Sequence, residues 1–259
     1  HLVYIRLKGL FLSSEDRNLW ATEAWYTLNE IPSEKGFVNP AREPVPNILS
    51  DREKQGGWKL LFDGKSTAGW RNFKSEKIGS AWKVRDGALY LDVSQKNSGG
   101  DIVTTGEYEN YELSLEWKIQ KCGNSGVMFN VMEADQYEYV WQTGPEMQIL
   151  DNTCHPDGRF EKHRAGDLYD LVESRFVAVN PAGDWNQARI VANKGKYQFW
   201  LNGYQVVSFD MNGSEWKDLV AESKFRDMPD FGKSTKGRIS LQDHGDQVWF
   251  RNIKIKEIR

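Results

Sequence analysis

Histidine and cysteine are scarce in this sequence: among 259 residues there are four histidines and two cysteines. The cysteines, Cys122 and Cys154, form no CxxC pair and no Cys/His spacing typical of structural zinc. Two cysteines in so long a chain are not a disulfide framework either. They could pair, lie buried as small apolar groups, or be unrelated, so composition does not fix the redox compartment.

Long apolar runs and unbalanced charge are also missing. No run approaches about 18 apolar residues, so we expect no membrane span. Charged residues make up 27% of the chain and the net charge is −3, which gives no reason to expect nucleic acid as a partner. There is no internal repeat, and no secretory signal is visible at His1, which we expect to be a processed or truncated end.

Tryptophan, in contrast, is abundant, with 11 residues. Tryptophan in a β-rich chain either fills the core of a sandwich or forms platforms for flat sugar faces. From Trp58 onward, alternating apolar residues and turn signals predict short antiparallel strands. The predicted elements are a strand at Trp58–Gly64, a hairpin at Trp82–Leu91 turning at Asp86-Gly87, a strand at Tyr111–Ile119, and a hairpin at Tyr197–Phe209 turning at Asn202-Gly203. Few helices and no βαβ rhythm indicate an all-β sandwich.

The first 56 residues differ from this pattern and contain four of the eight prolines. Ser14–Tyr26 could form a helix, with serine at its N-cap and acidic residues in its first turn. Ile31–Pro46 is rich in proline and is interpreted as an extended connector. We therefore predict an N-terminal extension, residues 1–56, and a catalytic β domain, residues 57–259.

The stretch Asn124–Asn130 is the first that concentrates polar chemistry. Asn124, Gly126, Met128 and Asn130 would share one strand face. Glycine within a strand marks either a bulge or a close approach by a ligand.

The stretch Glu146-x-Gln148-x-x-Asp151 is the second. Its spacing is partly similar to the paired carboxylates Glu-x-Asp-x-x-Glu of laminarinase-like glycosidases, although Gln148 cannot ionise. A two-carboxylate glycosidase requires a carboxyl separation of about 5–5.5 Å or about 6.5–9.5 Å. A solvated polar face is the structural alternative.

The third stretch is Gln242-Asp243-His244-Gly245, between two predicted strands. A turn needs glycine, asparagine or aspartate but has no need of histidine. Gln242 and His244 have the parity opposite to Ile239 and Leu241, so they should point away from the core. The apolar parity then breaks near Arg251-Asn252, which predicts a bulge. His155 and His163 lie in a predicted loop, where histidine is more often a surface residue.

Taken together, these stretches resemble the 3-keto-disaccharide hydrolase family from about Trp58 to Ile258. The matching segments include Leu60–Lys65, Gly69-Trp70, Asn124–Gly126, Glu146–Asp151, His155–Asp157, Ala165–Asp170, Trp185-Asn186, Trp200–Gly203, Ser223–Phe225, Gly237–Gly245 and Phe250–Ile253. The resemblance implies a concanavalin-like jelly roll of two curved antiparallel sheets. It also implies substrates already oxidised at C3 of a sugar ring, often in exported bacterial proteins, so a periplasmic or exported location is expected.

Elimination from a 3-keto-glycoside needs a general base, a stabiliser for an enolate oxygen and a proton for the leaving oxygen. On this resemblance His244 or Glu146 is expected to be the base, with Asp243 either orienting His244 or facing away. The residues expected to hold the sugar or the developing charge are Asn124, Gln148, Lys224, Gln242, Arg251 and Trp200. A divalent cation on Glu146, Asp151 or His155 could polarise the ketone, and a metal is left open.

Two other functions remain open at this stage. One is a conventional glycoside hydrolase using Glu146 and Asp151. The other is a non-catalytic, lectin-like carbohydrate-binding module, since a jelly roll supports catalysis and binding alike. If the chain acts on keto sugars, a sugar 3-oxidoreductase is the expected functional partner.

Overall fold

A computed structural model describes residues 2–6, 23–27, 45–95 and 98–258 of the chain. The chain divides into two compact units, His1–Val45 and Pro46–Arg259. In the first, β1 (Leu2–Arg6) pairs antiparallel with β2 (Glu23–Thr27), with Leu2 opposite Thr27. The predicted helix at 14–26 is therefore wrong over 23–26, where aromatic residues favour a strand. Its residues 14–22, and residues 31–44 of the predicted connector, lie outside the described ranges.

The second unit begins at Pro46, earlier than the predicted boundary at residue 57. The amide of Asn252 donates to Asn47 Oδ1 at 2.8 Å, and the short helix α1 (Asp51–Gln55) is fixed by a capping box between Ser50 and Glu53. Glu53 also forms an ion pair with Lys254. These contacts attach residues 46–56 to the β domain.

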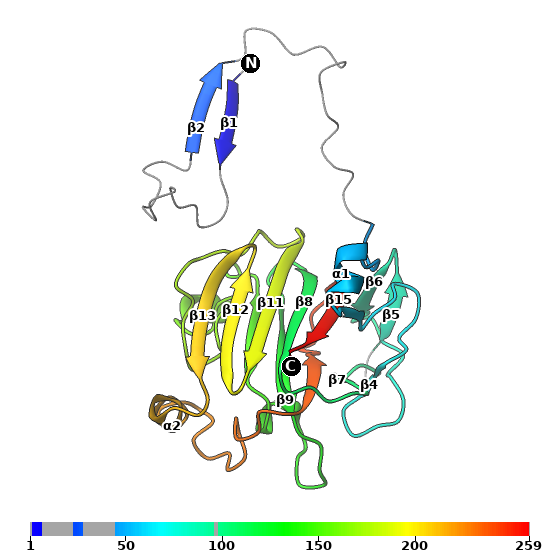
Figure 1. Ribbon diagram of the computed structural model, residues 1–259, viewed down its shortest axis with the longest axis vertical. Coiled ribbons are helices and arrows are strands. Elements are labelled where there is room, and N and C mark those ends of the chain that lie inside the picture. The colour runs from blue at the N-terminus through cyan, green and yellow to red at the C-terminus, as the bar shows by residue number, and fades with distance from the viewer. Residues whose placement is uncertain (1, 7–22, 28–44, 96–97, 259) are drawn as a thin grey trace. The chain divides into compact units, whose positions relative to one another are not determined.

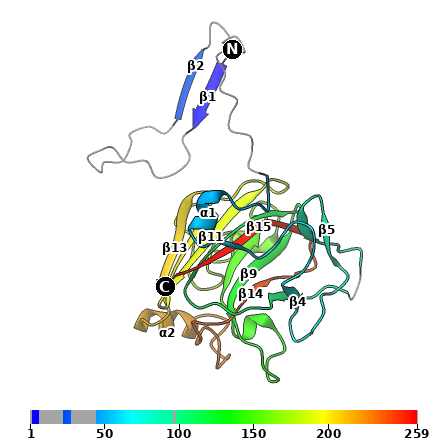
Figure 2. The same ribbon diagram turned by 45° about the vertical axis from the view of Figure 1, so that its right-hand side comes forward.

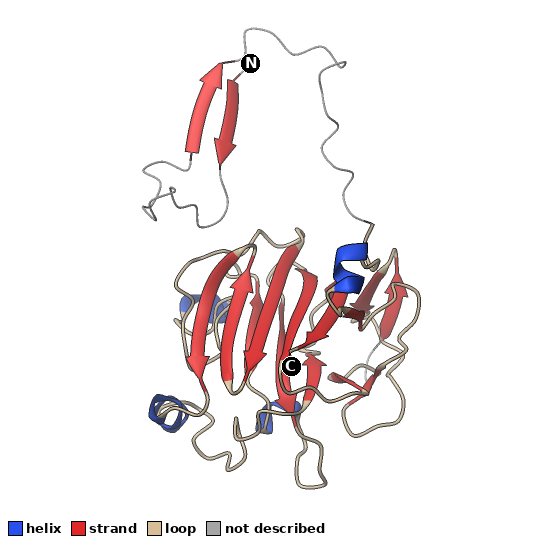
Figure 3. Ribbon diagram, viewed as in Figure 1, coloured by secondary structure: helices blue, strands red, loops and turns tan. Residues whose placement is uncertain are grey.

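Two antiparallel sheets make up this domain, as predicted (Figures 1 and 3). The larger has the order β13-β12-β11-β8-β15-β6-β5, with β3 also paired to β15; the smaller has the order β10-β9-β14-β7-β4. The strands of the larger sheet are β3 (Lys59–Leu60), β5 (Trp82–Arg85), β6 (Ala88–Leu91), β8 (Tyr111–Ile119), β11 (Asn186–Asn193), β12 (Lys196–Leu201), β13 (Tyr204–Asp210) and β15 (Val248–Glu257). Those of the smaller sheet are β4 (Trp70–Asn72), β7 (Ile102–Thr104), β9 (Asn124–Val131), β10 (Glu146–Leu150) and β14 (Arg238–Leu241).

Helical segments are short and lie between strands (Figure 3). Within the described ranges they are, besides α1, the helix α2 (Ser214–Ala221) and the 3-10 turns η2 (Val140–Gln142) and η3 (Pro156–Arg159). Over the part of the chain that the structure describes, every helix falls short of the length and apolarity that crossing a membrane requires.

The main core lies between the two sheets, as the alternation of strand residues predicted. Val127 and Phe129 of β9, Met147 of β10 and Leu241 of β14 all join one large cluster of buried apolar side chains. Both predicted hairpins form, at β5–β6 and β12–β13. Figure 2 shows β9 and β14 of the smaller sheet side by side, consistent with their pairing. Asn124 and Gly126, which alternate with the core residue Val127 along β9, lie on the face that points away from the main core.

Two backbone irregularities alter this alternation. The register between β15 and β8 shifts between Arg251 and Lys254, and Asn252 has φ +53, so the predicted bulge is confirmed. Asn130 also has a positive φ, of 56, and its Nδ2 donates to the buried Tyr197 hydroxyl at 2.7 Å. The expectation that Asn130 shares a face with Asn124 is therefore wrong, because the left-handed residue turns the side chain into the core.

Candidate active site

Three neighbouring strands of the smaller sheet bring the polar stretches of the sequence together. Gln148 of β10 lies opposite Gly126 of β9, and the amide of Gln242, just after β14, donates to the Gly126 carbonyl at 3.0 Å. Glu146 lies opposite Met128, one pair further along the same face. Segments more than a hundred residues apart therefore supply one row of polar side chains.

A cavity of about 320 Å³ opens over this row. Its volume is in the range of small-molecule sites. Its lining consists of Asn124, Trp141, Glu146, Gln148, Tyr169, Lys224, Phe225, Met228, Gln242 and His244. Six of the nine catalytic and substrate-binding residues expected from the sequence are in this set.

Glu146 lies at the base of the cavity and is only 7% exposed. A Cβ atom at Gly126 would overlap the Glu146 carboxyl, so glycine leaves the space that this carboxyl occupies over β9. Burial raises the pKa of Glu146 from 4.5 to about 8, against the opposing effect of the Lys224 ammonium. At neutral pH Glu146 is therefore a protonated acid that can donate a hydrogen bond.

Lys224 reaches the cavity from the loop after α2. Its backbone N–H donates to Asp170 Oδ2 at 2.7 Å, and the next residue, Phe225, stacks on Phe231 with ring centroids 3.9 Å apart. The ammonium lies 4.0 Å from the centroid of the Tyr169 ring. Partial burial lowers the pKa of Lys224, and the nearby acids Glu146, Asp170 and Asp157 oppose that effect. The cavity thus holds a cation beside an aromatic face and a protonated carboxyl.

Two amide side chains present unused hydrogen-bonding atoms to the cavity. Asn124 Oδ1 and Gln242 Oε1 are buried and have no hydrogen-bond partner among the described residues. The main chain at Asn124 is held separately, because its N–H donates to Asp246 Oδ2 at 3.0 Å. Buried polar atoms normally have partners, so these two are suited to a ligand that carries hydroxyl groups.

His244 is exposed and lies at the mouth of the cavity. Its ring faces the edge of His155, with centroids 6.2 Å apart. Asp243 points elsewhere: its Oδ2 accepts from Gly100 N at 2.6 Å and its Oδ1 from Gly245 N at 2.9 Å. Of the two orientations expected for Asp243, the structure shows the one that faces away from His244, since both carboxylate oxygens fix backbone turns.

Arg251 and Trp200 do not reach the cavity, because both belong to the other sheet. Arg251, on β15, forms an ion pair with Glu116 at 2.6 Å and lies 4.0 Å from the centroid of the Trp185 ring. The ring of Trp200, on β12, is covered by the Arg189 guanidinium at 4.4 Å. Both side chains alternate with core residues of their strands, so they lie on the outer face of the larger sheet.

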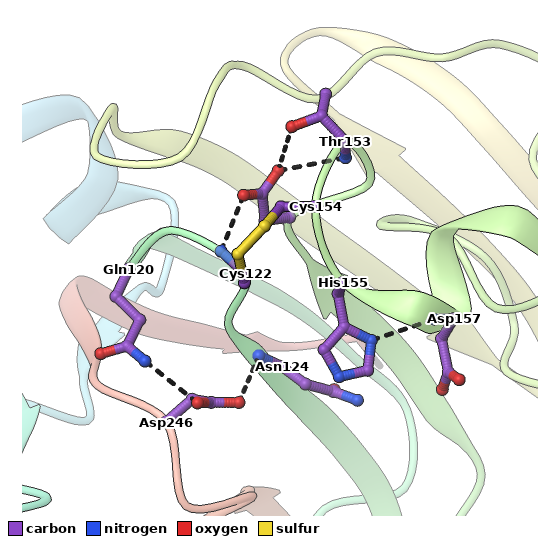
Figure 4. The surroundings of a disulfide bond; sticks show 9 residues. Gln120, Cys122, Asn124, Thr153, Cys154, His155, Asp157 and Asp246 are labelled. Atoms are coloured by element: carbon purple, nitrogen blue, oxygen red, sulfur yellow. Dashed lines mark hydrogen bonds between the residues drawn. A yellow bond between two sulfur atoms is a disulfide. The ribbon is translucent and has the colours of Figure 1, made fainter.

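Cys122 and Cys154 form a disulfide beside the cavity (Figure 4). The bond joins the loop before β9 to the loop after β10, and Asn124 and His155 follow the two cysteines closely along the chain. Asp151 accepts from Cys122 N at 2.8 Å and from Thr153 Oγ1 at 2.7 Å. Asp151 thus supports the disulfide loop and does not line the cavity.

The cation ligands suggested by the sequence are not brought together. Within the described ranges, the group of three His, Cys, Asp or Glu ligand atoms within 4.8 Å of one another is Cys122, Asp151 and Cys154. The sulfur atoms of that group are joined to each other. His155 Nδ1 accepts from Asp157 N at 3.1 Å, which leaves only its other ring nitrogen for another partner.

Sequence reasoning missed four residues that line the cavity: Trp141, Tyr169, Phe225 and Met228. The Tyr169 amide donates to the Glu146 carbonyl at 3.0 Å, so the 165–170 segment runs along the free edge of β10. This segment was among the matched motifs, which was the available signal for Tyr169. No local sequence signal distinguished Trp141 from the tryptophans of the core.

Comparison with known proteins gives consistent matches over this domain. The model of a family described as "3-keto-alpha-glucoside-1,2-lyase-like domain" matches residues 57–256. A protein of Bacteroides thetaiotaomicron named 3-keto-disaccharide hydrolase is 34% identical over 226 residues, covering 77% of this chain and 78% of that protein. A solved Parabacteroides distasonis structure, assigned as a glycosyl hydrolase, is also 34% identical, covers 83% of this chain and all of that chain, and has a TM-score of 0.76.

A second solved Parabacteroides distasonis structure with the same assignment is 29% identical, with a TM-score of 0.59, and covers 78% of this chain and 99% of that one. A Bacillus subtilis protein with a galectin-like fold is 12% identical, with a TM-score of 0.52, over 77% of this chain and 98% of that one. This last likeness shows the fold alone, and it agrees with the two-sheet architecture.

Proposed function

This chain belongs to the 3-keto-alpha-glucoside-1,2-lyase-like family, and on that basis we propose that it cleaves glycosides oxidised at C3. The reaction proposed is elimination across C1 and C2, followed by addition of water, which gives net hydrolysis. The observation that carries the proposal is a single cavity lined by one buried protonated carboxyl, one ammonium and an imidazole at its mouth.

In the proposed reaction, His244 removes the proton from C2, which the neighbouring ketone acidifies. An imidazole is suited to proton transfer near neutral pH. The electron pair left at C2 delocalises to the C3 oxygen, and the Lys224 ammonium stabilises that negative charge. The pair then forms the C1=C2 double bond and breaks the bond from C1 to the leaving oxygen.

Glu146 supplies the proton that the leaving oxygen needs. Because its pKa is about 8, it carries this proton at neutral pH. The leaving group departs as an alcohol, and water adding across C1=C2 gives the free 3-keto sugar. The unpartnered amide oxygens of Asn124 and Gln242 accept hydrogen bonds from sugar hydroxyls.

The geometry favours this route over a conventional two-carboxylate glycosidase. That mechanism needs a second carboxyl across the glycosidic bond. Asp151, the expected second carboxyl, is bonded to Cys122 and Thr153 and does not line the cavity.

The direct test is product analysis by mass spectrometry. The protein is incubated with a 3-keto-glucoside and with its unoxidised parent, each with and without a chelator. Cleavage of the keto compound alone is the expected result, and chelator sensitivity would add a divalent cation. Cleavage of the parent would overturn elimination, and tight binding of sugars without turnover would favour a lectin-like module.

The assignment of the base is tested by His244→Asn, with Trp200→Phe as the control on the other sheet. Removing a general base typically costs a factor of about 10²–10⁴ in rate, so kcat should fall by at least about 100-fold. The control should keep normal activity. Near-normal turnover by His244→Asn would contradict the assignment of His244 as the base.

The proposed substrate and the disulfide together suggest a preceding enzyme and a cellular location. A 3-keto sugar must be supplied by an oxidoreductase acting at C3, which we propose as the preceding enzyme. We also propose a periplasmic or exported location, supported by the disulfide between Cys122 and Cys154. Disulfides persist in oxidising compartments and are rare in the cytosol. Fractionation of the native host would test the location.

A further inference from the structure

A second cavity, of about 440 Å³, adjoins the candidate active site. Trp141, Gln242 and His244 line both cavities. The two spaces therefore adjoin at the proposed base. The second one extends away from Glu146 and Lys224, over the ends of β4, β7 and η2. Its lining is Asn72, Phe73, Gly100, Asp101, Glu138, Tyr139, Trp141, Gln242, Asp243 and His244.

A stacked aromatic pair forms one wall of this second cavity. The rings of Tyr139 and Trp141 lie 4.9 Å apart with only 7° between their planes, and Tyr139 is 44% exposed. Trp141, like Phe73, packs against a small apolar cluster on the outer face of the smaller sheet, formed by Val103, Met128, Val131 and Val140. This support keeps the pair in place as a flat platform.

The backbone beneath the platform is also fixed. Gln142 Oε1 accepts from the N–H of Tyr139 at 2.8 Å, and the buried Tyr137 hydroxyl donates to Asp230 at 2.9 Å. An exposed aromatic held this rigidly costs little entropy when a ligand stacks on it. The apolar faces of pyranose rings are suitable ligands for such a surface.

Charge distinguishes the second cavity from the first. Among the described residues that line it are three acids, Asp101, Glu138 and Asp243, and no lysine or arginine. The first cavity, in contrast, includes Lys224. A carboxylate or sulfate group in the second cavity would face like charges without a compensating cation.

We propose that the second cavity is the leaving-group subsite, which holds a neutral pyranose ring stacked on Tyr139 and Trp141 and disfavours anionic rings. The proposal rests on the proposed function, because it assigns the two halves of a disaccharide to the two cavities. The oxidised ring lies among Glu146, Lys224 and Gln148, and the glycosidic bond lies near His244, where the cavities meet.

The first test compares Tyr139→Ala with wild type on two substrates, a 3-keto disaccharide of two glucose units and a methyl 3-keto-glucoside. The ratio of kcat/KM for the disaccharide to that for the methyl glucoside should fall about tenfold in the variant. The two leaving alcohols differ in acidity, but this difference does not affect the comparison, because wild type and Tyr139→Ala are each assayed on both substrates. Phe176→Ala, which removes an aromatic of equal exposure (45%) outside both cavities, should leave the ratio unchanged.

The second test replaces the leaving glucose with glucuronate, at pH 8. This pH is above the value of about 6 to which burial raises the pKa of Asp101, so Asp101 is charged. Wild type should cleave the glucuronate compound about tenfold less efficiently than the glucose compound, and Glu138→Lys should reduce that difference severalfold.

The outcomes separate the two proposals. If wild type cleaves neither keto compound, the proposed function fails and the subsite fails with it. If wild type cleaves both but Tyr139→Ala leaves the ratio unchanged, the stacking platform is overturned and the proposed function stands. Equal cleavage of the glucose and glucuronate compounds would overturn the preference for neutral rings.

Discussion

The buried carboxyl of Glu146 should make the stability of the fold depend on pH in a direction that is unusual for an acid. Its pKa rises from 4.5 to about 8 on folding, so the folded protein keeps a proton that the unfolded chain releases. The stabilisation is therefore complete below pH 4.5 and is lost as the pH rises through 8. Each pH unit within this window corresponds to about 1.4 kcal/mol, and the whole window to about 5 kcal/mol.

Glu146→Gln tests this reasoning, because glutamine has the same shape and cannot ionise. The free energy of unfolding of the variant minus that of wild type should be constant below pH 4.5. It should then rise by up to about 1.4 kcal/mol per pH unit and level off above pH 8. Urea unfolding followed by tryptophan fluorescence at pH 4, 5, 6, 7, 8 and 9 measures this difference.

Glu133→Gln is the matched control with the opposite sign. Ion pairing with Arg71 lowers the pKa of Glu133 from 4.5 to about 2, so its stabilisation is present above pH 4.5 and is lost on acidification. The free energy of unfolding of Glu133→Gln minus that of wild type should be constant between pH 4.5 and 8. A flat difference for Glu146→Gln over the same window would refute the buried neutral carboxyl and, with it, the proposed proton donor.

Three further predictions follow from contacts around the cavity. Reducing the disulfide, or Cys154→Ser, should lower the free energy of unfolding by about 4 kcal/mol, since the bond closes a loop of 32 residues; unfolding in the presence and absence of a reductant measures it. Lys224→Met should raise the pKa of Glu146 further, because the ammonium opposes the effect of burial, so the midpoint of the pH-dependent difference should move upward. A chain beginning at Pro46 should unfold at the same urea concentration as the full chain. A chain beginning at Gly57 should be less stable by about 1–3 kcal/mol, because it lacks the bonds of Asn47 and Glu53 to β15.

Much of the fold was predictable because alternation and turn residues are local signals. Asp86-Gly87 and Asn202-Gly203 marked two hairpins that form, and the broken parity near Arg251 marked a bulge that forms. The helix at 14–26 was wrong over 23–26 because β2 gains hydrogen bonds from a strand about twenty residues away, which no local propensity encodes.

The residues of the candidate site were likewise predictable only where a local sequence signal fixed their position. Parity placed Gln242 on the outer face of its strand. Glu146 and Gln148 alternate with the core residues Met147 and Ile149, and the strand register brings all three together. The sequence could not say which sheet a residue belongs to, so Arg251 and Trp200 were expected at the wrong surface. Their partners, Glu116 and Arg189, lie on neighbouring strands of the larger sheet. Assigning a strand to a sheet depends on long-range pairing that the sequence pattern does not contain.

The glycine at position 126 means that two positions on neighbouring strands share the volume of one side chain. The Glu146 carboxyl fills the space above Gly126, so neither position can be varied freely while the other stays fixed. A larger residue at 126 would push the carboxyl out toward water, where it would ionise at ordinary pH. The acidity of this site is thus controlled from the adjacent strand, by a residue that has no side chain and no charge.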